Sequence, residues 1–119
     1  METQEIAKKL TDYCKRADWT GAHKELYSND ALSVEPFETP EYEKETRGIG
    51  AINEKGEKFN ASVEKYHQID VSNPLVAGNS IAFTLTMDMS LKGKGRMKSP
   101  ELCVYECKDG KIIAERFFV

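Results

Sequence analysis

The sequence predicts one α+β domain in which N-terminal helices pack in the concave face of a curled antiparallel sheet. Two patterns predict this class. In the first half, apolar residues mostly recur with helical spacing, and after residue 64 they alternate with polar residues, as in strands with one buried face. The predicted strands are long, roughly 9–11 residues against a usual mode of about 5–6, and long twisted strands curl. A curled sheet with helices across its hollow side leaves a pocket between the two layers.

Three amphipathic helices are expected, over residues 3–18, 19–27 and 48–63. Asp18 is a favoured N-cap residue and marks the start of the second helix. The polar cluster at residues 28–30 is typical of a turn, so we expect it to end that helix. The helices precede most of the strands, which places them together on one side of the sheet.

The remaining elements are strands and one loop. A short strand is expected over residues 31–35, because Pro36 stops it, and residues 36–47 lack a clear period and are expected to form a loop. Short turns join the later strands, so these are expected to run antiparallel. Pro100 marks a bulge or an edge position in one of them. The later strands cover residues 66–71 with 75–76, 81–90, 97–107 and 112–119.

Composition bounds the class of protein. The chain has 119 residues, 39% of them hydrophobic and 31% charged, with a net charge of −3, which suits one globular domain over residues 1–119. Charges of both signs are mixed and form no basic stripe, so we expect no nucleic-acid partner. No segment approaches the roughly 18 apolar residues of a membrane span, so we expect no membrane partner. Because the first residues show no signal-peptide pattern, the expected location is cytoplasmic.

The three cysteines indicate structural thiols rather than a metal site or a disulfide framework. Cys103 and Cys107 share one strand face, but no nearby His or Cys completes a zinc site. An odd number of cysteines argues against a framework of disulfides. The chain also lacks a dinucleotide-binding fingerprint, a phosphate loop and a nucleophile elbow. We therefore expect no metal and no cofactor.

Glu35 is the first candidate for a catalytic residue. It ends a strand just before Pro36 and the long loop, where the mouth of a pocket is expected. A carboxyl group buried there, with a raised pKa, works as a general base near neutral pH. A solvated glutamate at the edge of the loop, or one that caps a backbone turn, is the alternative interpretation.

His67 is the second candidate. If Tyr66 faces one side of its strand, His67 faces the other side with Ile69 and Val71, which suggests the buried face. A neutral imidazole there acts as an acid, a base or a hydrogen-bond donor. The alternative is a core histidine whose hydrogen bonds are satisfied within the protein. His23, on the second helix, is expected to be partly exposed.

Other acidic and aromatic side chains are candidates for the lining of the pocket. Acids in the interior of a sheet are costly unless they are paired or solvated, so one or two strand acids are expected to line a polar part of it. They could equally face solvent or pair with an arginine across an interface. Aromatic residues supply apolar lining, and those that follow Pro36 could form a lid. The candidate lining residues are Trp19, Tyr27, Phe37, Tyr42, Phe59, Phe83, Asp88, Glu101, Tyr105, Glu115 and Phe117.

Seven short stretches, spread over nearly the whole chain, carry a family pattern: Asp18-Trp19, Leu26 to Ala31, Ser33 to Pro36, Arg47 to Ile52, Lys55-Gly56, Asp109 to Ile113 and Glu115 to Phe118. In this order they resemble the SnoaL-like group of the nuclear-transport-factor-2-like superfamily. Its members include polyketide cyclases, ketosteroid isomerases and limonene epoxide hydrolases. The resemblance indicates the fold more specifically than the function, because the fold hosts unrelated chemistries and non-catalytic binders.

The resemblance implies a cone-shaped domain with a pocket between helices and concave sheet, and a homodimer formed through the outer face of the sheet. Ketosteroid isomerases carry a proton-shuttling carboxylate at the strand-end position that Glu35 occupies here, with Glu in place of Asp. A dimer also fits the chain itself, because the second face of strand 81–90, with Ala82, Thr84 and Thr86, is small and weakly polar.

Two functional hypotheses follow. In the first, the protein binds a small, mostly apolar organic molecule and performs cofactor-free acid/base chemistry of the isomerase, cyclase or hydratase type, with Glu35 and His67 as proton carriers. In the second, it is a non-catalytic ligand-binding or dimerising module. The sequence does not choose between them.

Overall fold

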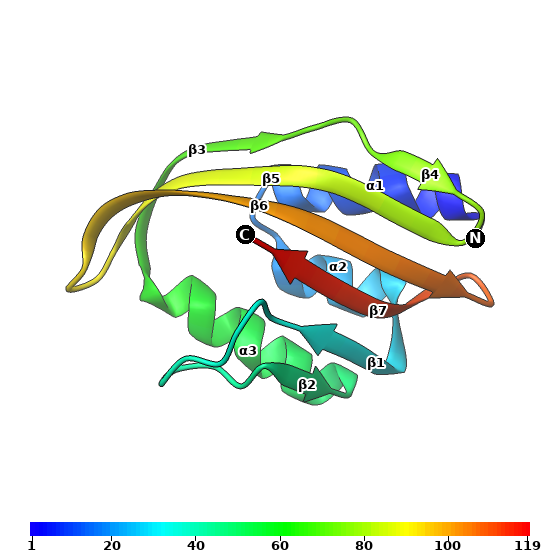
Figure 1. The fold of residues 1–119 in the computed structure, drawn as a ribbon, viewed down its shortest axis with the longest axis horizontal. Helices are drawn as coiled ribbons and strands as arrows, with labels where there is room; N and C mark the ends of the chain where they lie inside the picture. The colour runs from blue at the N-terminus through cyan, green and yellow to red at the C-terminus, as the bar shows by residue number, and fades with distance from the viewer.

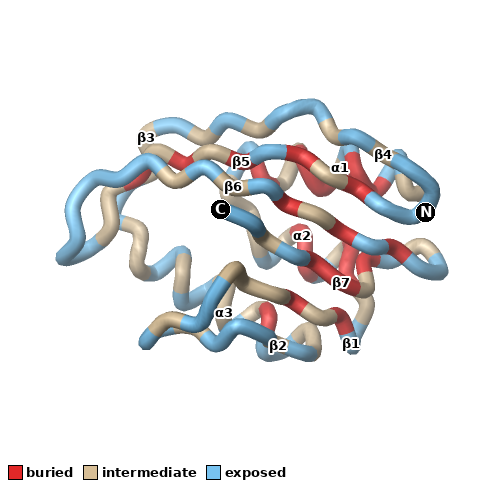
Figure 2. The backbone as a smooth tube through the Cα atoms, viewed as in Figure 1, coloured by how far each residue is buried: buried red, intermediate tan, exposed pale blue.

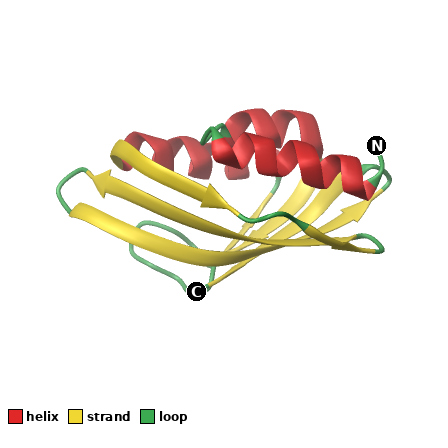
Figure 3. Cartoon of the chain, turned by 90° about the horizontal axis from the view of Figure 1, so that it is seen from above, coloured by secondary structure: helices red, strands yellow, loops and turns green.

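Three helices cover one face of a curved seven-stranded sheet in the computed structural model, which describes residues 1–119 (Figures 1 and 3). Helix α1 spans Thr3–Lys15, α2 spans Trp19–Leu26 and α3 spans Ile49–Ser62. All three lie on the concave side of the sheet (Figure 3). The predicted α+β class is therefore confirmed.

The sheet has the order β2-β1-β7-β6-β5-β3, with β4 paired to β5. All pairs are antiparallel except β1 with β7, which run parallel. The expectation of a wholly antiparallel sheet is thus wrong at one place, because α3 separates β1 from the later strands and β7 enters beside β1 in the same direction. The strands are β1 (Tyr27–Val34), β2 (Glu45–Arg47), β3 (Val63–Val71), β4 (Leu75–Ala77), β5 (Ser80–Leu91), β6 (Gly95–Lys108) and β7 (Lys111–Phe118).

Two boundaries around β1 differ from the prediction. The strand begins directly after α2, so the polar residues 28–30 lie inside it rather than in a turn. A register shift against β7 between Tyr27 and Leu32 accommodates them. Part of the expected loop, residues 45–47, forms the edge strand β2, which pairs with residues 32–34 of β1. Because β2 is short and polar, it shows no apolar alternation in the sequence.

Strands β5 and β6 are 12 and 14 residues long, even longer than expected, and give the sheet its curl. Pro100 causes no shift of register between them, since it pairs directly with Thr86. The pairing of β6 with β7 stops at Leu102, so one side of Pro100 has no neighbouring strand. Pro100 therefore occupies a local edge, where its missing N–H group leaves no gap in the ladder.

The core lies between α1, α2 and the centre of the sheet (Figure 2). On β5, every second residue from Ile81 to Met89 is buried, which confirms the predicted alternation. Helix α1 buries one face that includes Leu10, and α2 ends on the fully buried Leu26. Helix α3, in contrast, buries only Ile52, so the space between α3 and the sheet is incompletely filled. This hollow becomes the site described below.

Asp18 caps α2 as expected. Its Oδ1 atom accepts a hydrogen bond of 3.0 Å from the backbone N–H of Gly21. The bond satisfies one of the free N–H groups at the start of the helix. A cap here fixes where α2 begins, and α2 in turn carries Trp19 and His23 toward the hollow.

We predict that Leu26→Ala lowers the free energy of unfolding by about 2–5 kcal/mol, because it removes a fully buried side chain and leaves a void. Urea denaturation followed by circular dichroism measures the loss. Leu75→Ala is the matched control, since Leu75 is 76% exposed, and should change stability by less than about 0.5 kcal/mol. Equal effects of the two substitutions would contradict this description of the core.

Candidate functional site

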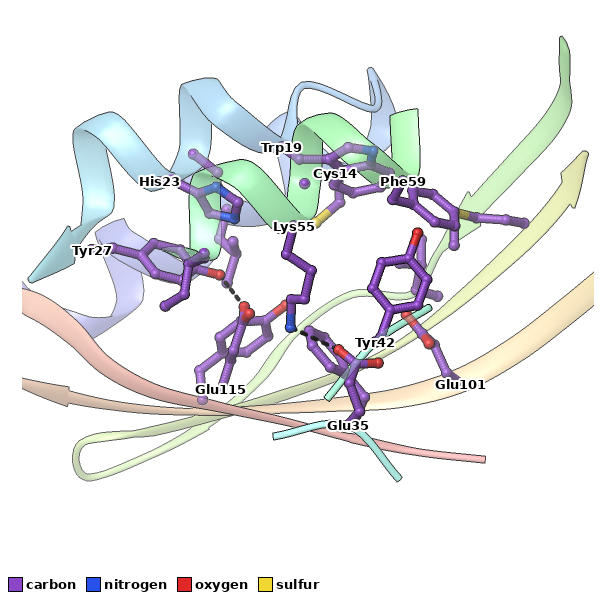
Figure 4. A pocket seen from close by; sticks show the side chains of 18 residues that line it. Cys14, Trp19, His23, Tyr27, Glu35, Tyr42, Lys55, Phe59, Glu101 and Glu115 are labelled. Carbon is purple, nitrogen blue, oxygen red and sulfur yellow. Dashed lines mark hydrogen bonds and ion pairs between the residues drawn. The ribbon is translucent and has the colours of Figure 1, made fainter. Parts of the chain in front are cut away.

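A cavity of about 170 Å³ lies between the helices and the concave face of the sheet (Figure 4). Twelve of its 18 lining residues are hydrophobic. The lining residues come from α1, α2, α3, β1, β5, β6 and β7, and from the segment between β1 and β2. Glu35 and eight of the candidate lining residues border it: Trp19, Tyr27, Tyr42, Phe59, Glu101, Tyr105, Glu115 and Phe117.

Three candidate lining residues lie elsewhere. Phe37 is 58% exposed, because it points out of the segment that follows β1. Phe83 is buried in the core behind the cavity wall, stacked on Tyr105 with 5.4 Å between ring centroids. Asp88 is not among the lining residues, and it pairs with Arg96 of the neighbouring strand at 3.0 Å.

His67 does not reach the cavity either. A register shift in β3 falls between Tyr66 and Gln68, so residues on either side of it do not follow simple alternation. Tyr66, Ile69 and Val71 all pack against the core. His67 is left on the other face, where its Nε2 atom lies 2.7 Å from Ser90 Oγ. The expectation that His67 shares a face with Ile69 and Val71 is therefore wrong, because it assumed an unbroken strand.

Two polar side chains of the lining were not expected from the sequence. His23 is only 7% exposed, contrary to the expectation of partial exposure, and its Nδ1 atom lies 2.8 Å from Asn53 Oδ1. Lys55 points into the hollow from α3 (Figure 4). The sequence could have predicted that Lys55 faces the cavity, since it lies three residues after Ile52 and four before Phe59, on their helical face. The surrounding charged residues obscured that spacing.

A chain of hydrogen bonds joins the polar side chains on one side of the cavity, and Figure 4 shows two of its contacts, Tyr27 with Glu115 and Lys55 with Glu35. The Lys55 ammonium group donates to Glu35 Oε2 at 2.8 Å and to Ser33 Oγ at 2.5 Å. Ser33 in turn donates to Glu115 Oε2 at 2.6 Å, and the Tyr27 hydroxyl donates to Glu115 Oε1. These contacts connect α3, β1 and β7 through one network.

In this network Glu115 is the acceptor of two hydrogen bonds. Lys55 only donates, so Ser33 must accept from it and give its single proton to Glu115. The Tyr27 hydroxyl has Glu115 as its hydrogen-bond partner, and burial together with the nearby carboxylate raises the pKa of Tyr27 well above its usual value. Both oxygens of Glu115 therefore accept from hydroxyl protons, although the residue is only 4% exposed.

Glu101 has a different environment. It enters the cavity from β6, and its hydrogen-bond contact is the weakly donating thiol of Cys103 at 3.7 Å. Burial raises the pKa of Glu101 to about 7, with a further contribution from the negative charge of Glu35. The carboxyl group is thus close to half protonated at neutral pH, in a mostly apolar space and without a strong partner.

The histidine and the cysteines at the cavity stay neutral near pH 7. Burial lowers the pKa of His23, so its imidazole is uncharged. Burial raises the pKa of the Cys14 thiol to about 12, and raises that of Cys103 as well. Thiols held protonated are poor nucleophiles. Chemistry at this site therefore rests on the carboxyl groups and Lys55.

The segment between β1 and β2 covers one side of the cavity. Tyr42 lines the cavity, and the Lys58 ammonium group lies 4.9 Å from the centre of its ring. Glu41 forms an ion pair of 3.3 Å with Lys94 in the turn between β5 and β6. These exposed contacts are individually weak, so the segment is held in place by several small interactions.

Two other features bear on the kind of site. Nowhere do three or more His, Cys, Asp or Glu side chains cluster in a way that could hold a metal ion. None of the three helices combines the length and the apolar character needed to cross a membrane.

Helices packed on a curled sheet enclose a mostly apolar cavity that also contains acidic side chains. This arrangement defines a class of small domains with an internal pocket. The chain belongs to the SnoaL-like domain family, whose model matches residues 1–119. A proposed SnoaL-like polyketide cyclase from Mesorhizobium loti is 31% identical, with all of both chains covered and a TM-score of 0.90. No curated protein matches the chain.

More distant solved structures share the fold. A Xanthomonas campestris protein of unknown function with a cystatin-like fold is 21% identical, with 99% of this chain and 90% of the other covered and a TM-score of 0.83. A hypothetical Catenulispora acidiphila protein with a ketosteroid isomerase-like fold, in complex with trimethylamine, is 13% identical. The comparison covers 97% of this chain and 85% of that one, with a TM-score of 0.75. At these identities the likeness concerns the fold alone.

We predict that the pKa of Glu101 makes stability depend on pH. Its folded pKa of about 7 exceeds the ordinary value of 4.5, so ionisation costs stability as pH rises between these values. Glu101→Gln removes that cost, and its stability relative to the unmodified protein should rise by about 2–3 kcal/mol between pH 5 and 8. Urea denaturation across this range gives the difference.

Asp88→Asn is the control for this pH dependence. The ion pair with Arg96 lowers the pKa of Asp88, so this residue is ionised throughout the range, folded or unfolded. The stability difference of Asp88→Asn should stay flat between pH 5 and 8. A flat curve for Glu101→Gln as well would show that Glu101 titrates normally.

Proposed function

We propose that the protein binds a small, mostly apolar organic molecule in this cavity and performs cofactor-free acid/base chemistry on it, with Glu101 as the proton carrier. The observation that carries the proposal is a carboxyl group in an apolar cavity whose hydrogen-bond contact is a thiol. An acid or base is most effective when its pKa lies near the working pH, and that of Glu101 is about 7. The SnoaL-like family, of the cyclase and isomerase type, agrees with this reaction class.

Glu35 takes a supporting role in this proposal. Its carboxylate is held by the Lys55 ammonium group at 2.8 Å, which restricts its movement. Its negative charge also helps to raise the pKa of Glu101. Glu35 is therefore a positioning residue that tunes Glu101, rather than the base expected from its place at the end of the strand. His67 has no role, since it lies outside the cavity.

The proposed reaction is a proton transfer at a carbon next to a carbonyl group. Ionised Glu101 removes a proton from that carbon, the electron pair of the C–H bond moves into the carbonyl group, and an enolate forms. Protonated Glu101 then returns the proton to the same or a conjugated carbon, so the enzyme is restored. The apolar lining keeps bulk water from competing with this transfer.

Hydrogen–deuterium exchange tests the reaction without the natural substrate. In heavy water, the protein should accelerate exchange of protons next to the carbonyl of single-ring ketones, with and without an amino group, as followed by proton NMR. Glu101→Gln should lower the accelerated rate by about 10²–10⁴-fold, the usual contribution of a general acid or base. Asp88→Asn should leave it unchanged. Exchange by Glu101→Gln at the unmodified rate would exclude Glu101 as the proton carrier.

A non-catalytic ligand-binding module is the second candidate, and two observations favour it. Glu35 is paired within the protein, and His67 is bonded to Ser90 outside the cavity. A binder needs no free proton carrier, so these two residues behave as that hypothesis expects. Ligand binding without any acceleration of proton exchange would support it over the catalytic proposal.

We also propose a homodimer formed through the outer face of the sheet. On this face Thr84 of β5 pairs with Leu102 of β6, and Leu102 pairs with Phe118 of β7. Leu102 is 41% and Phe118 is 50% exposed, so two large apolar side chains lie side by side at the surface. A second copy of the chain would bury this row against itself by twofold symmetry.

Light scattering at micromolar concentration should therefore give twice the mass of one chain. Leu102→Glu places a charge in the apolar row and should give a monomer. Phe37→Glu adds the same charge at an exposed aromatic residue outside the sheet and should leave the dimer intact. A monomeric mass for the unmodified protein would contradict the proposal.

A further inference from the structure

The cavity contains more acidic than basic side chains. Glu35, Glu101 and Glu115 border it, whereas Lys55 is the one lysine or arginine among its lining residues. His23, the remaining basic group, has a pKa lowered by burial and is neutral. A buried charge without a partner is costly, so this imbalance must be stabilised by the protein or by a ligand.

The single cation of the cavity, Lys55, already has hydrogen-bond partners within the protein. The Lys55 ammonium group donates to Glu35 and to Ser33, and reaches Glu115 only through the Ser33 hydroxyl. Glu115 receives hydrogen bonds from two neutral hydroxyl groups, and Glu101 receives one from a thiol. Two carboxyl groups therefore face the same cavity with no cation bonded to either.

The walls of the cavity suit an ammonium group. Tyr27, Tyr42, Phe59, Tyr105 and Phe117 supply aromatic rings, whose faces attract cations within about 6 Å of their centres. The protein itself shows the arrangement, because the Lys55 ammonium group lies 5.9 Å from the centre of the Phe117 ring while it pairs with Glu35. A second ammonium group would meet the same combination of carboxylate and aromatic ring.

We infer that the ligand of this cavity is an organic cation, with an ammonium group that pairs with Glu101 and an apolar body about the size of one ring. The inference rests on the proposed ligand-binding function and names its substrate class. The volume of about 170 Å³ sets the size of the body, since an apolar cavity of roughly 150 Å³ holds a benzene molecule. An anionic ligand would face uncompensated repulsion here.

Binding should also depend on pH. The charged and titratable groups near Glu101 are Glu35 after β1, Glu115 on β7, Cys103 on β6 and Lys55 on α3. The negative charges of Glu35 and Glu115 favour protonated Glu101, and a bound cation would favour its ionised form. The affinity for a cation should therefore rise between pH 6 and pH 8, as Glu101 becomes ionised, and level off above that range.

Three probes with one ring each test the charge. Benzylamine is a cation at pH 8, benzyl alcohol is neutral and benzoate is an anion, and the three differ little in size. By isothermal titration calorimetry, the affinity for benzylamine should exceed that for benzyl alcohol at least tenfold, and benzoate should not bind. The preference for benzylamine should weaken severalfold at pH 6.

Variants identify the carboxyl group with which the ammonium group pairs. Glu101→Gln should remove most of the preference for benzylamine over benzyl alcohol while retaining the binding of benzyl alcohol. Glu115→Gln also removes a negative charge from the cavity but not the partner of the ammonium group, so it should lower the preference less, and thermal unfolding shows that each variant is folded. Asp88→Asn also removes one carboxylate, but outside the cavity, so the preference should be unchanged.

The outcomes separate this inference from the proposed function. If benzyl alcohol binds as tightly as benzylamine, the cation inference is overturned, while binding of a small organic molecule stands. If none of the three probes binds or shifts the melting temperature, the inference and the proposed ligand-binding function both fail. A tenfold preference that persists in folded Glu101→Gln would place the cation away from this carboxyl group and overturn the inference.

Discussion

The Lys55 ammonium group ties helix α3 to the sheet where the helix makes few apolar contacts. Helix α3 buries only Ile52, so apolar packing alone would hold it weakly. The bonds from Lys55 to Ser33 and Glu35 fix its distance from β1 instead, and Ser33 passes the connection to Glu115 on β7. An ion pair can hold two elements apart as well as together, because its length is set by the side chains. The open space beside α3 is the consequence.

Keeping carboxyl groups in such a space costs stability. Removing a charged group from water is unfavourable unless hydrogen bonds and an opposite charge replace the solvent, as they do for Glu35. Glu115 is compensated by two hydroxyl donors, and Glu101 is compensated least, which is why burial raises its pKa. Perturbed acids of this kind gather at functional sites more often than elsewhere. An apolar residue at position 101 would make the domain more stable and the cavity chemically inert.

The local sequence pattern predicted most of the fold. The features that it did not predict depend on contacts between segments far apart in the sequence. The alternation from Ile81 to Met89 identified the buried face of β5, since each residue's side is fixed by its neighbours in sequence. The parallel pairing of β1 with β7 joins segments about 80 residues apart, and no local pattern encodes it. In the site, strand alternation left the acids open between cavity and solvent, and the structure places Glu101 and Glu115 at the cavity but not Asp88. His67 was misplaced because a bulge in β3 reverses the faces. Such a bulge depends on the neighbouring strand rather than on the residues around it.

Glu35, at the end of β1, and Glu101, in the middle of β6, differ in the role that their neighbours allow. Glu35 becomes a supporting residue, and Glu101 becomes the candidate proton carrier. Position alone favours Glu35, which lies at the rim of the cavity and matches the strand-end acid of related enzymes. Its neighbour Lys55, however, holds the Glu35 carboxylate in an ion pair of 2.8 Å, so this carboxylate is not free to contact a ligand. Glu101 remains free to contact one because its nearest partner is a thiol and the closest charges are negative. The same negative surroundings that raise the pKa of Glu101 also attract a cation, so proton transfer and cation binding would compete for one carboxyl group and be linked through pH.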